Sequence, residues 1–356
     1  MNASRHSSIS RLRNDGLTLL EILLSTAVLG IVLIAIAATM SSMQNIWTSV
    51  REKSDQYRTT RLAMDTIAAR LSSAMLAPRW EHDPEATGTD ERYVRQSDLH
   101  FVCGPADELL RSRSFPGNAI FFQAPLGERG TDGEVDSYDP LHQALSAWGY
   151  FVELGSDAGT RPPFLQDQTE LAPARMRFRL MEFRQPAHEL TIFQSANSNQ
   201  TQPELATESQ RDRLYGWFRK PVVEGNLRDR PVSMVADNVL AILLTPVDPE
   251  NDGSSPLAGD DGVYDTRRHL WQPNRPQSTL SRHRLPPVVQ LTVIAMSEDA
   301  WTNITGDQIA KLRSVVDGRF RDTKALKSDL NFVDTELTRL KMPHRILTMK
   351  IRMNDA

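Results

Sequence analysis

Residues 17–40 read LTLLEILLSTAVLGIVLIAIAATM, and this stretch governs how the rest of the chain is interpreted. A run of 29 residues without a charged side chain starts inside this stretch at Ile22 and ends at Val50. About 20 consecutive apolar residues in a helix cross a hydrocarbon core about 30 Å thick. The sequence therefore predicts a membrane-spanning helix over residues 17–43.

The residues before the span are polar. Residues 1–16, MNASRHSSISRLRNDG, carry three arginines, Arg5, Arg11 and Arg13. Basic residues flanking a span tend to stay cytoplasmic, so the C-terminus is expected on the outer side. A secretory signal has an apolar stretch of about 7–15 residues followed by a small-residue cleavage site. This run is longer, and residues 39–43, TMSSM, make a poor site of that kind.

A single acidic residue, Glu21, interrupts the apolar run. A carboxylate inside a membrane helix costs about 2.5–3.5 kcal/mol on insertion scales. One interpretation is that Glu21 extends to the membrane interface. The other rests on the string GLTLLEILLSTAVLG at residues 16–30, which resembles the class III signal of type IV pilins and type II secretion pseudopilins. That signal combines a basic leader, a glycine, an apolar run and a glutamate at the fifth mature position.

The resemblance implies a role for each matching residue. Gly16 would be the glycine after which a prepilin peptidase cuts, and residues 1–16 the removed cytoplasmic leader. Leu17, where the family usually has Phe, would become the N-terminus, which is usually N-methylated. Glu21 would pair with the N-terminal amine of a neighbouring subunit, and Gly30 would permit local melting of the helix.

The helix is expected to continue beyond the membrane over residues 44–77, with Pro78 ending it. Apolar residues recur there at spacings of three, four or seven, which indicates one helical stripe. The intervening positions are charged. A coiled-coil stalk is one explanation, but the strands that follow favour packing against a sheet. The stripe consists of Ile46, Val50, Tyr57, Met64, Ile67, Leu71 and Met75.

A domain built on strands is expected over residues 98–298. Short runs suited to strands are separated by polar stretches. Polar segments at 81–97, 197–211 and 246–284 are expected to be loops. Within 176–183 the apolar residues alternate with arginines, which predicts that one face of this strand is exposed to solvent. The strand runs are Leu99–Val102, Ala119–Gln123, Trp148–Leu154, Met176–Phe183, Asn238–Leu244 and Val288–Met296.

Two of these strands extend the resemblance to a more specific group within the pilin-like proteins. In J-type minor pseudopilins a strand, a loop and an "LP..V.l.l.l" strand follow one another, and this chain has matching residues at Val239, Leu243, Leu285, Pro286, Val289, Leu291 and Val293. The fuller pattern resembles the Verru_Chthon cassette protein C family. It is carried by DNVLAILLTP, PLA with VYDTR, and LPPVVQLTVIAMSEDAW.

Residues 299–356 are expected to form a helical extension and a final strand. Leu326, Leu330, Val333, Leu337 and Leu340 follow spacings of 4, 3, 4 and 3, which predicts an amphipathic helix that ends at Pro343. It could bind a partner, although packing on its own sheet is favoured. Leu347, Met349, Ile351 and Met353 then alternate with polar residues, which predicts a half-buried strand.

Composition limits the chemistry. The chain has 356 residues, a net charge of −4 and one cysteine, Cys103. A nucleic-acid footprint is therefore not expected, and a cysteine-based zinc site is excluded. G-x-S-x-G, H-E-x-x-H and P-loop motifs are absent from the sequence, so we expect no enzyme. Calcium is the one cofactor to consider, because the acidic loop at 248–261 carries hard oxygen ligands, although a solvated acidic loop is the favoured explanation and no cofactor is expected. Those residues are Asp248, Asn251, Asp252, Asp260 and Asp261.

Together these observations predict an α+β fold. A long pilin-like N-terminal helix, its first half transmembrane, would pack on an antiparallel β-sheet domain with a C-terminal helix and a final strand. The resemblance implies a structural subunit, a minor pseudopilin in the bacterial inner membrane with its C-terminal domain in the periplasm. Its partners would be a prepilin peptidase, other pilin-like subunits and an inner-membrane assembly platform. The alternative is a minor pilin that acts as a substrate- or surface-binding tip module.

Overall fold

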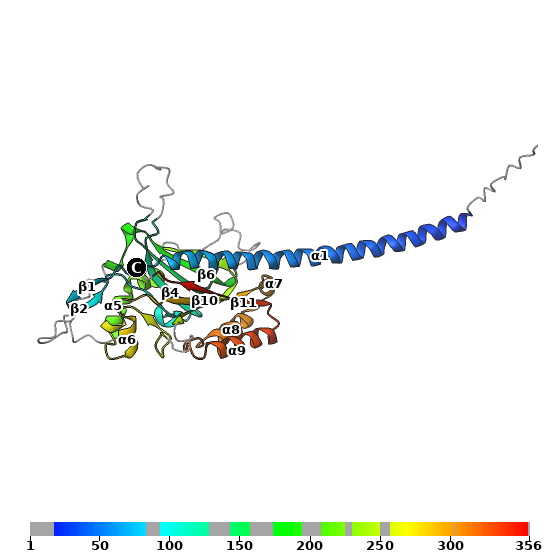
Figure 1. Cartoon of the computed structure of the whole chain (residues 1–356). Helices are drawn as coiled ribbons and strands as arrows, with labels where there is room; N and C mark the ends of the chain where they lie inside the picture. The colour runs from blue at the N-terminus through cyan, green and yellow to red at the C-terminus, as the bar shows by residue number, and fades with distance from the viewer. Residues whose placement is uncertain are drawn as a thin grey trace, which may run out of the picture. The chain divides into compact units, whose positions relative to one another are not determined.

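The structure is a computed structural model, described here for residues 18–82, 93–127, 143–156, 174–193, 208–224, 230–249, 257–302 and 304–354. The chain divides into two units, residues 1–54 and residues 55–356. Helix α1, Leu19–Ser72, contributes to both (Figure 1). The fold class is α+β, as expected, with an apolar N-terminal helix followed by antiparallel sheets.

In the first unit, α1 is uncovered. Residues Leu19–Gln44 form a stretch of 26 residues with mean hydropathy 2.6, and none of its most apolar window is buried by other parts of the chain. Such a helix is long and apolar enough to cross a membrane. Among the described residues it is the one helix with that length and composition.

In the second unit, the last turns of α1 bury the expected apolar stripe. Met64, Ile67 and Leu71 are almost completely buried. Arg70, beside them, pairs with Glu182, donates a 3.0 Å hydrogen bond to the Tyr150 hydroxyl and lies over the Trp148 ring. This part of α1 therefore packs against a sheet and not against a second helix of a stalk.

A six-stranded antiparallel sheet forms the centre of the second unit, in the order β7-β6-β5-β4-β3-β9. Its strands are β3 Val102–Pro105, β4 Asn118–Ala124, β5 Ser146–Ser156, β6 Met176–Gln185, β7 Val232–Asp237 and β9 Tyr264–Asp265. A second, three-stranded antiparallel sheet has the order β11-β10-β8. Its strands are β8 Val239–Val247, β10 Val288–Met296 and β11 His344–Arg352.

The two sheets are joined at a corner formed by Asn238. This residue has φ of +58°, a left-handed conformation that asparagine tolerates better than most residues, and it separates β7 from β8. Its side chain donates to Glu298, which also receives two 2.8 Å hydrogen bonds from Arg177. One run of chain therefore leaves the first sheet and enters the second within a single residue.

The six-stranded sheet is buried on both faces. Ile120, Tyr150 and Leu180 point into a core shared with α1, the three-stranded sheet and the C-terminal helices α8, Gly306–Val316, and α9, Leu326–Arg339. The opposite face packs under α5, Glu208–Arg219, in a second core rich in aromatic rings. Phe121 stacks there on Phe218 with ring centroids 4.1 Å apart.

Shorter elements complete the chain. A separate two-stranded sheet pairs β1 with β2, and in the described residues three short helices and three further turns lie between the strands. Their bounds are β1 Arg79–His82, β2 Tyr93–Gln96, α2 Ala106–Leu109, η3 Ala187–Glu189, the π-helical turn η6 Lys220–Glu224, η8 Arg268–Leu270, α6 Pro276–Ser281 and α7 Asp299–Thr302.

Several sequence expectations are corrected. Helix α1 ends at Ser72, before Ala77, because the Met75 N–H donates to the Gln123 carbonyl of β4 and leaves the helical pattern. The expected loop at 81–97 contains strand residues at both of its described ends. The first strand of the domain is Val102–Pro105, and not Leu99–Val102.

Further corrections concern β6 and the loops. The face of β6 that carries Arg179 is not wet, because Arg179 is buried and donates to the Ser156 carbonyl. Helix α5 begins inside the expected loop 197–211, and β9, η8 and α6 lie inside 246–284. By contrast, the helix at 326–340 and the half-buried final strand are confirmed as α9 and β11.

Candidate functional site

The expected assembly residues lie at the start of α1. Glu21 is in the first turn, where its N–H donates to Thr18 and its carbonyl accepts a 2.7 Å hydrogen bond from the Ser25 hydroxyl. In the described chain the hydrogen bonds found at Glu21 all use its backbone, and the residue is exposed. Gly16 and Leu17 lie outside the described residues.

Gly30 lies on the same uncovered stretch of helix. A Cβ atom built on it would meet nothing within 4 Å, so packing within this chain does not require a glycine there. The proposed role of Gly30 in helix flexibility therefore stays a prediction. The expected effect of a glycine at this position is on helix stability, because glycine costs about 1 kcal/mol relative to alanine inside a helix.

The acidic loop considered for calcium is only partly described. Asn251 and Asp252 lie outside the described residues. The carboxylate of Asp261 contacts the Arg268 guanidinium at 2.6 Å and also accepts the Val263 N–H. Asp248 and Asp260 are the other two described members, and among the described residues no group of three or more possible ligands surrounds a metal position. Calcium binding stays an untested prediction.

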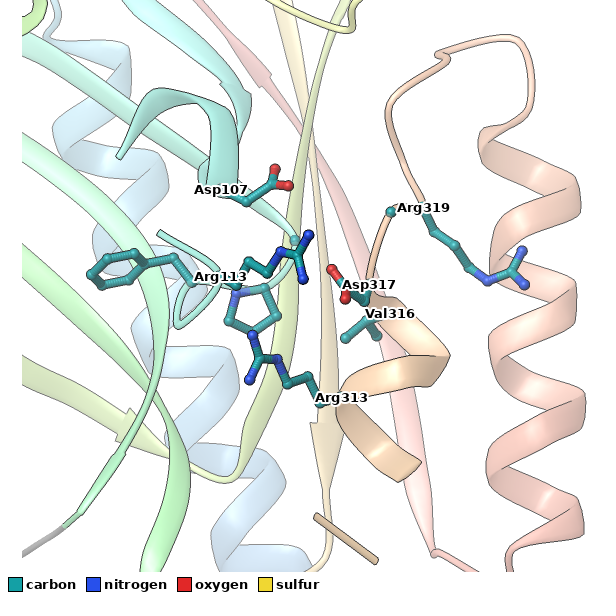
Figure 2. A pocket seen from close by; sticks show the side chains of 10 residues that line it. Asp107, Arg113, Arg313, Val316, Asp317 and Arg319 are labelled. Carbon is teal, nitrogen blue, oxygen red and sulfur yellow. The ribbon is translucent and has the colours of Figure 1, made fainter. Parts of the chain in front are cut away.

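A small charged niche opens between α2 and the C-terminal end of α8 (Figure 2). Arg113 points into it from one side, and Arg313 and Asp317 border it from α8. Its volume is about 10 Å³, which is the room for about one water molecule. The niche can hold a water or one oxygen of a larger group, but it cannot enclose an organic substrate.

A larger groove lies where α1 ends. Its volume is about 440 Å³, within the range of ligand-binding clefts, and its walls are mainly apolar. Phe193, which is 47% exposed, stands at the rim, and Asp98 and Gln143 are the polar members. The remaining lining residues are Met75, Leu76, Ala77, Leu99, Pro125 and Leu145.

The most elaborate cluster of polar groups is fully buried and was not found from the sequence. Asp265, at the end of β9, accepts four hydrogen bonds. Two reach Oδ1, from the His100 ring at 2.7 Å and from the Arg267 N–H at 2.7 Å. Two reach Oδ2, from the Tyr215 hydroxyl at 3.0 Å and from the Trp271 indole at 2.9 Å. The carboxylate therefore joins three separate segments of chain.

The protonation states of the cluster follow from these donors. The Trp217 indole donates to Nδ1 of His100, so the ring proton lies on Nε2 and points at Asp265. Burial lowers the pKa of His100 below its usual value, which keeps the ring neutral. Burial alone would raise the pKa of Asp265, but His100, Trp271 and the Arg267 N–H hold that pKa below its ordinary range. Asp265 is an anion.

The charge that balances Asp265 comes from Arg267. This guanidinium is buried and donates to the Asp98 carbonyl. Burial lowers the pKa of Arg267 to about 10, so it remains a cation at neutral pH. Because the cluster is sealed from solvent, it offers no open position for a substrate. The arrangement holds α5 against the six-stranded sheet.

A second pair of histidines, the buried His283 and the partly buried His269, lies beside this cluster. The rings of His269 and His283 are 4.7 Å apart, and neither nitrogen of His283 has a hydrogen-bond partner among the described residues. Burial, with further contributions from His269 and the neighbouring arginines, lowers the pKa of His283 to about 2. The ring is therefore neutral throughout the physiological range.

The sequence contains little that would identify the Asp265 cluster or the histidine pair. The segment VYDTR, noted above as part of a family resemblance, contains Asp265 and Arg267. Nothing in the spacing of His100, Tyr215 and Trp271 indicates that they share one carboxylate. The chain matches no family model, no curated protein and no solved structure.

Proposed function

We propose that this protein is a pilin-like structural subunit, a minor pseudopilin, of a type II secretion or type IV pilus-like filament. The observation that carries the proposal is the start of α1. It combines Gly16 after a basic leader, Glu21 five residues later, and an uncovered apolar helix that continues into a domain of antiparallel sheets. The protein would lie in the inner membrane, with residues 1–16 cytoplasmic before cleavage and the sheets periplasmic.

Glu21 would set the position of each subunit. Its carboxylate lies in an apolar run and makes no side-chain hydrogen bond in the part of the chain described. In a medium of low dielectric an unpaired carboxylate is strongly disfavoured, and pairing with a cation is correspondingly favourable. After cleavage at Gly16 a neighbour's N-terminal amine would be such a cation. The pair would form only when two helices stand at one axial offset.

Processing provides the first test. In a host with a prepilin peptidase, intact mass and N-terminal sequencing of the membrane-extracted protein should give Leu17 as the first residue. Gly16→Val should retain the leader, because the peptidase site is expected to exclude larger side chains. Gly30→Ala is the matched control and should be cleaved normally, since a Cβ there meets nothing within 4 Å. An uncleaved Met1, or a mature end near Ser41, would refute the proposal.

Assembly provides the second test. Glu21→Ala should still insert, because it removes a costly charge from the span, but crosslinking between engineered cysteines on adjacent subunits should fall. The native Cys103 is buried and would be replaced by serine. Ser25→Ala, one turn along the helix, is the control. Crosslinking of Glu21→Ala at the wild-type level would refute the axial-offset mechanism while leaving the membrane span intact.

A second candidate function is supported by the apolar groove at the end of α1. A tip subunit that binds a secreted substrate or a surface needs a recess of this kind, and about 440 Å³ is large enough for one or two side chains of a partner. Phe193→Ser should weaken recovery of partners from detergent extracts without changing cleavage at Gly16. Unchanged recovery of the same partners would exclude the groove.

A further inference from the structure

The C-terminal strand β11 is an open edge of the three-stranded sheet. It pairs with β10 over nine residues, from Val288↔Arg352 to Met296↔His344, without a register shift. On its other side no strand is paired with it in the described part of the chain (Figure 1). A straight, unpaired edge of this length presents a row of backbone donors and acceptors that another strand can use.

The two ends of β11 differ in their surroundings. At its first residues the strand is held from both sides, because Arg345 lies over the Tyr57 ring of α1 and His344 bonds to Asp334 of α9. At its other end Lys350 and Arg352 are exposed and form no ion pair among the described residues. They are two residues apart and therefore share one face of the strand.

The charge on this edge selects among possible partners. Residues 344–352 contain Arg345, Lys350 and Arg352 and no acidic residue. A second copy of β11 added antiparallel in full register would place Arg352 opposite His344 and Lys350 opposite Ile346, so it would offer no carboxylate to either cation. A strand with two acidic residues in alternate positions would place a carboxylate opposite Lys350 and another opposite Arg352.

We propose that β11 is a docking edge for an extended acidic segment of another protein, which adds to the sheet as a fourth strand. The segment would carry acidic residues two apart, facing Lys350 and Arg352, and apolar residues beside the half-buried Ile346, Leu347 and Met349. Backbone hydrogen bonds supply affinity in such strand addition, and alternate side chains supply specificity. The proposal goes beyond the assembly function and does not depend on Glu21.

The alternative is that the basic residues only protect the edge from aggregation, as lysines on edge strands often do. The test uses the full chain in detergent micelles and a nine-residue peptide of valine and threonine with glutamates at positions one and three, which antiparallel addition along 344–352 would place opposite Arg352 and Lys350. Hydrogen exchange of residues 344–353 should slow when the peptide is added. Exchange in β7, an edge strand of the other sheet, should not change. A peptide with lysines in place of the glutamates should bind at least tenfold more weakly.

Charge reversal makes the test specific. The variant Lys350→Glu with Arg352→Glu should lose the glutamate peptide and prefer the lysine peptide, by at least tenfold in each direction. Lys327→Glu, on the exposed face of α9, is the matched control and should bind as the wild type does. Absent protection of 344–353, equal binding of both peptides, or protection that appears with protein concentration alone would each overturn the proposal. The last result would identify a second copy as the occupant.

Discussion

Acid should destabilise the second unit through His283. The ring is 2% exposed, faces His269 and has no hydrogen-bond partner among the described residues. Its pKa is about 2 in the folded protein, because burial and the neighbouring cations disfavour the imidazolium form. In the unfolded chain the pKa of histidine is about 6.5. Below pH 6.5 the His283 ring therefore binds a proton in the unfolded chain but not in the folded protein.

The magnitude follows from this difference. When only the unfolded state is protonated, the free energy of unfolding falls by RT ln(1 + 10^(6.5 − pH)). The loss is about 0.2 kcal/mol at pH 7 and about 2 kcal/mol at pH 5. The sign is that of a group with a depressed folded pKa that is charged when protonated. Stability is greatest above pH 6.5 and declines as the pH falls from 6.5 toward 2.

The assay is urea unfolding at pH 7, 6 and 5, with a fragment that begins at Gln44. His283→Asn removes the titrating ring, and asparagine tolerates the φ of +45° at this position. The variant should lose about 2 kcal/mol less than the wild type between pH 7 and pH 5. His188→Gln is the control, because that side chain is 78% exposed. Equal pH dependence of wild type and His283→Asn would refute the reasoning.

Three further predictions concern the same unit. Asp265→Ala should lower the free energy of unfolding by about 3–5 kcal/mol in urea, since it strands four buried donors, whereas the exposed Asp260→Ala should change it by less than about 0.5 kcal/mol; similar costs would contradict the network. Gly149→Ala places a Cβ in steric overlap with the ring of Phe121, so overpacking should cost about 1–3 kcal/mol, and an unchanged thermal midpoint would count against this packing. A fragment from Gln44 should be soluble and folded by circular dichroism without detergent; aggregation of the fragment beside a well-behaved full chain in water would contradict the placement of the span.

The periodic parts of the fold could be predicted from the sequence. The stripe through Met64, Ile67 and Leu71 identified the buried face of α1, and alternation identified β11. Helix α5 was missed because its sequence, ESQRDRLYGWFR, begins with six polar residues and contains a glycine. Strand β7 was missed because it runs into β8 without a turn motif, and only the backbone of Asn238 marks the change of sheet.

The candidate sites divide in the same way. Gly16 and Glu21 are neighbours in a short motif, so the sequence alone could single them out. The Asp265 cluster is assembled from segments as far apart as His100 and Trp271, and no local spacing records a contact across 165 residues, the separation of His100 from Asp265. The prediction of a solvent-exposed face on β6 was wrong for a related reason, because Arg179 donates to the carbonyl of Ser156, which lies on another strand.

The corner at Asn238 has a mechanical consequence. Because β7 and β8 are one run of backbone bent at a single residue, tension along that run pulls on the edge of one sheet and on a strand of the other at once. In the filament proposed above, a pull along this run would load both sheets, and the hydrogen bonds among Arg177, Asn238 and Glu298 would resist opening of the bend.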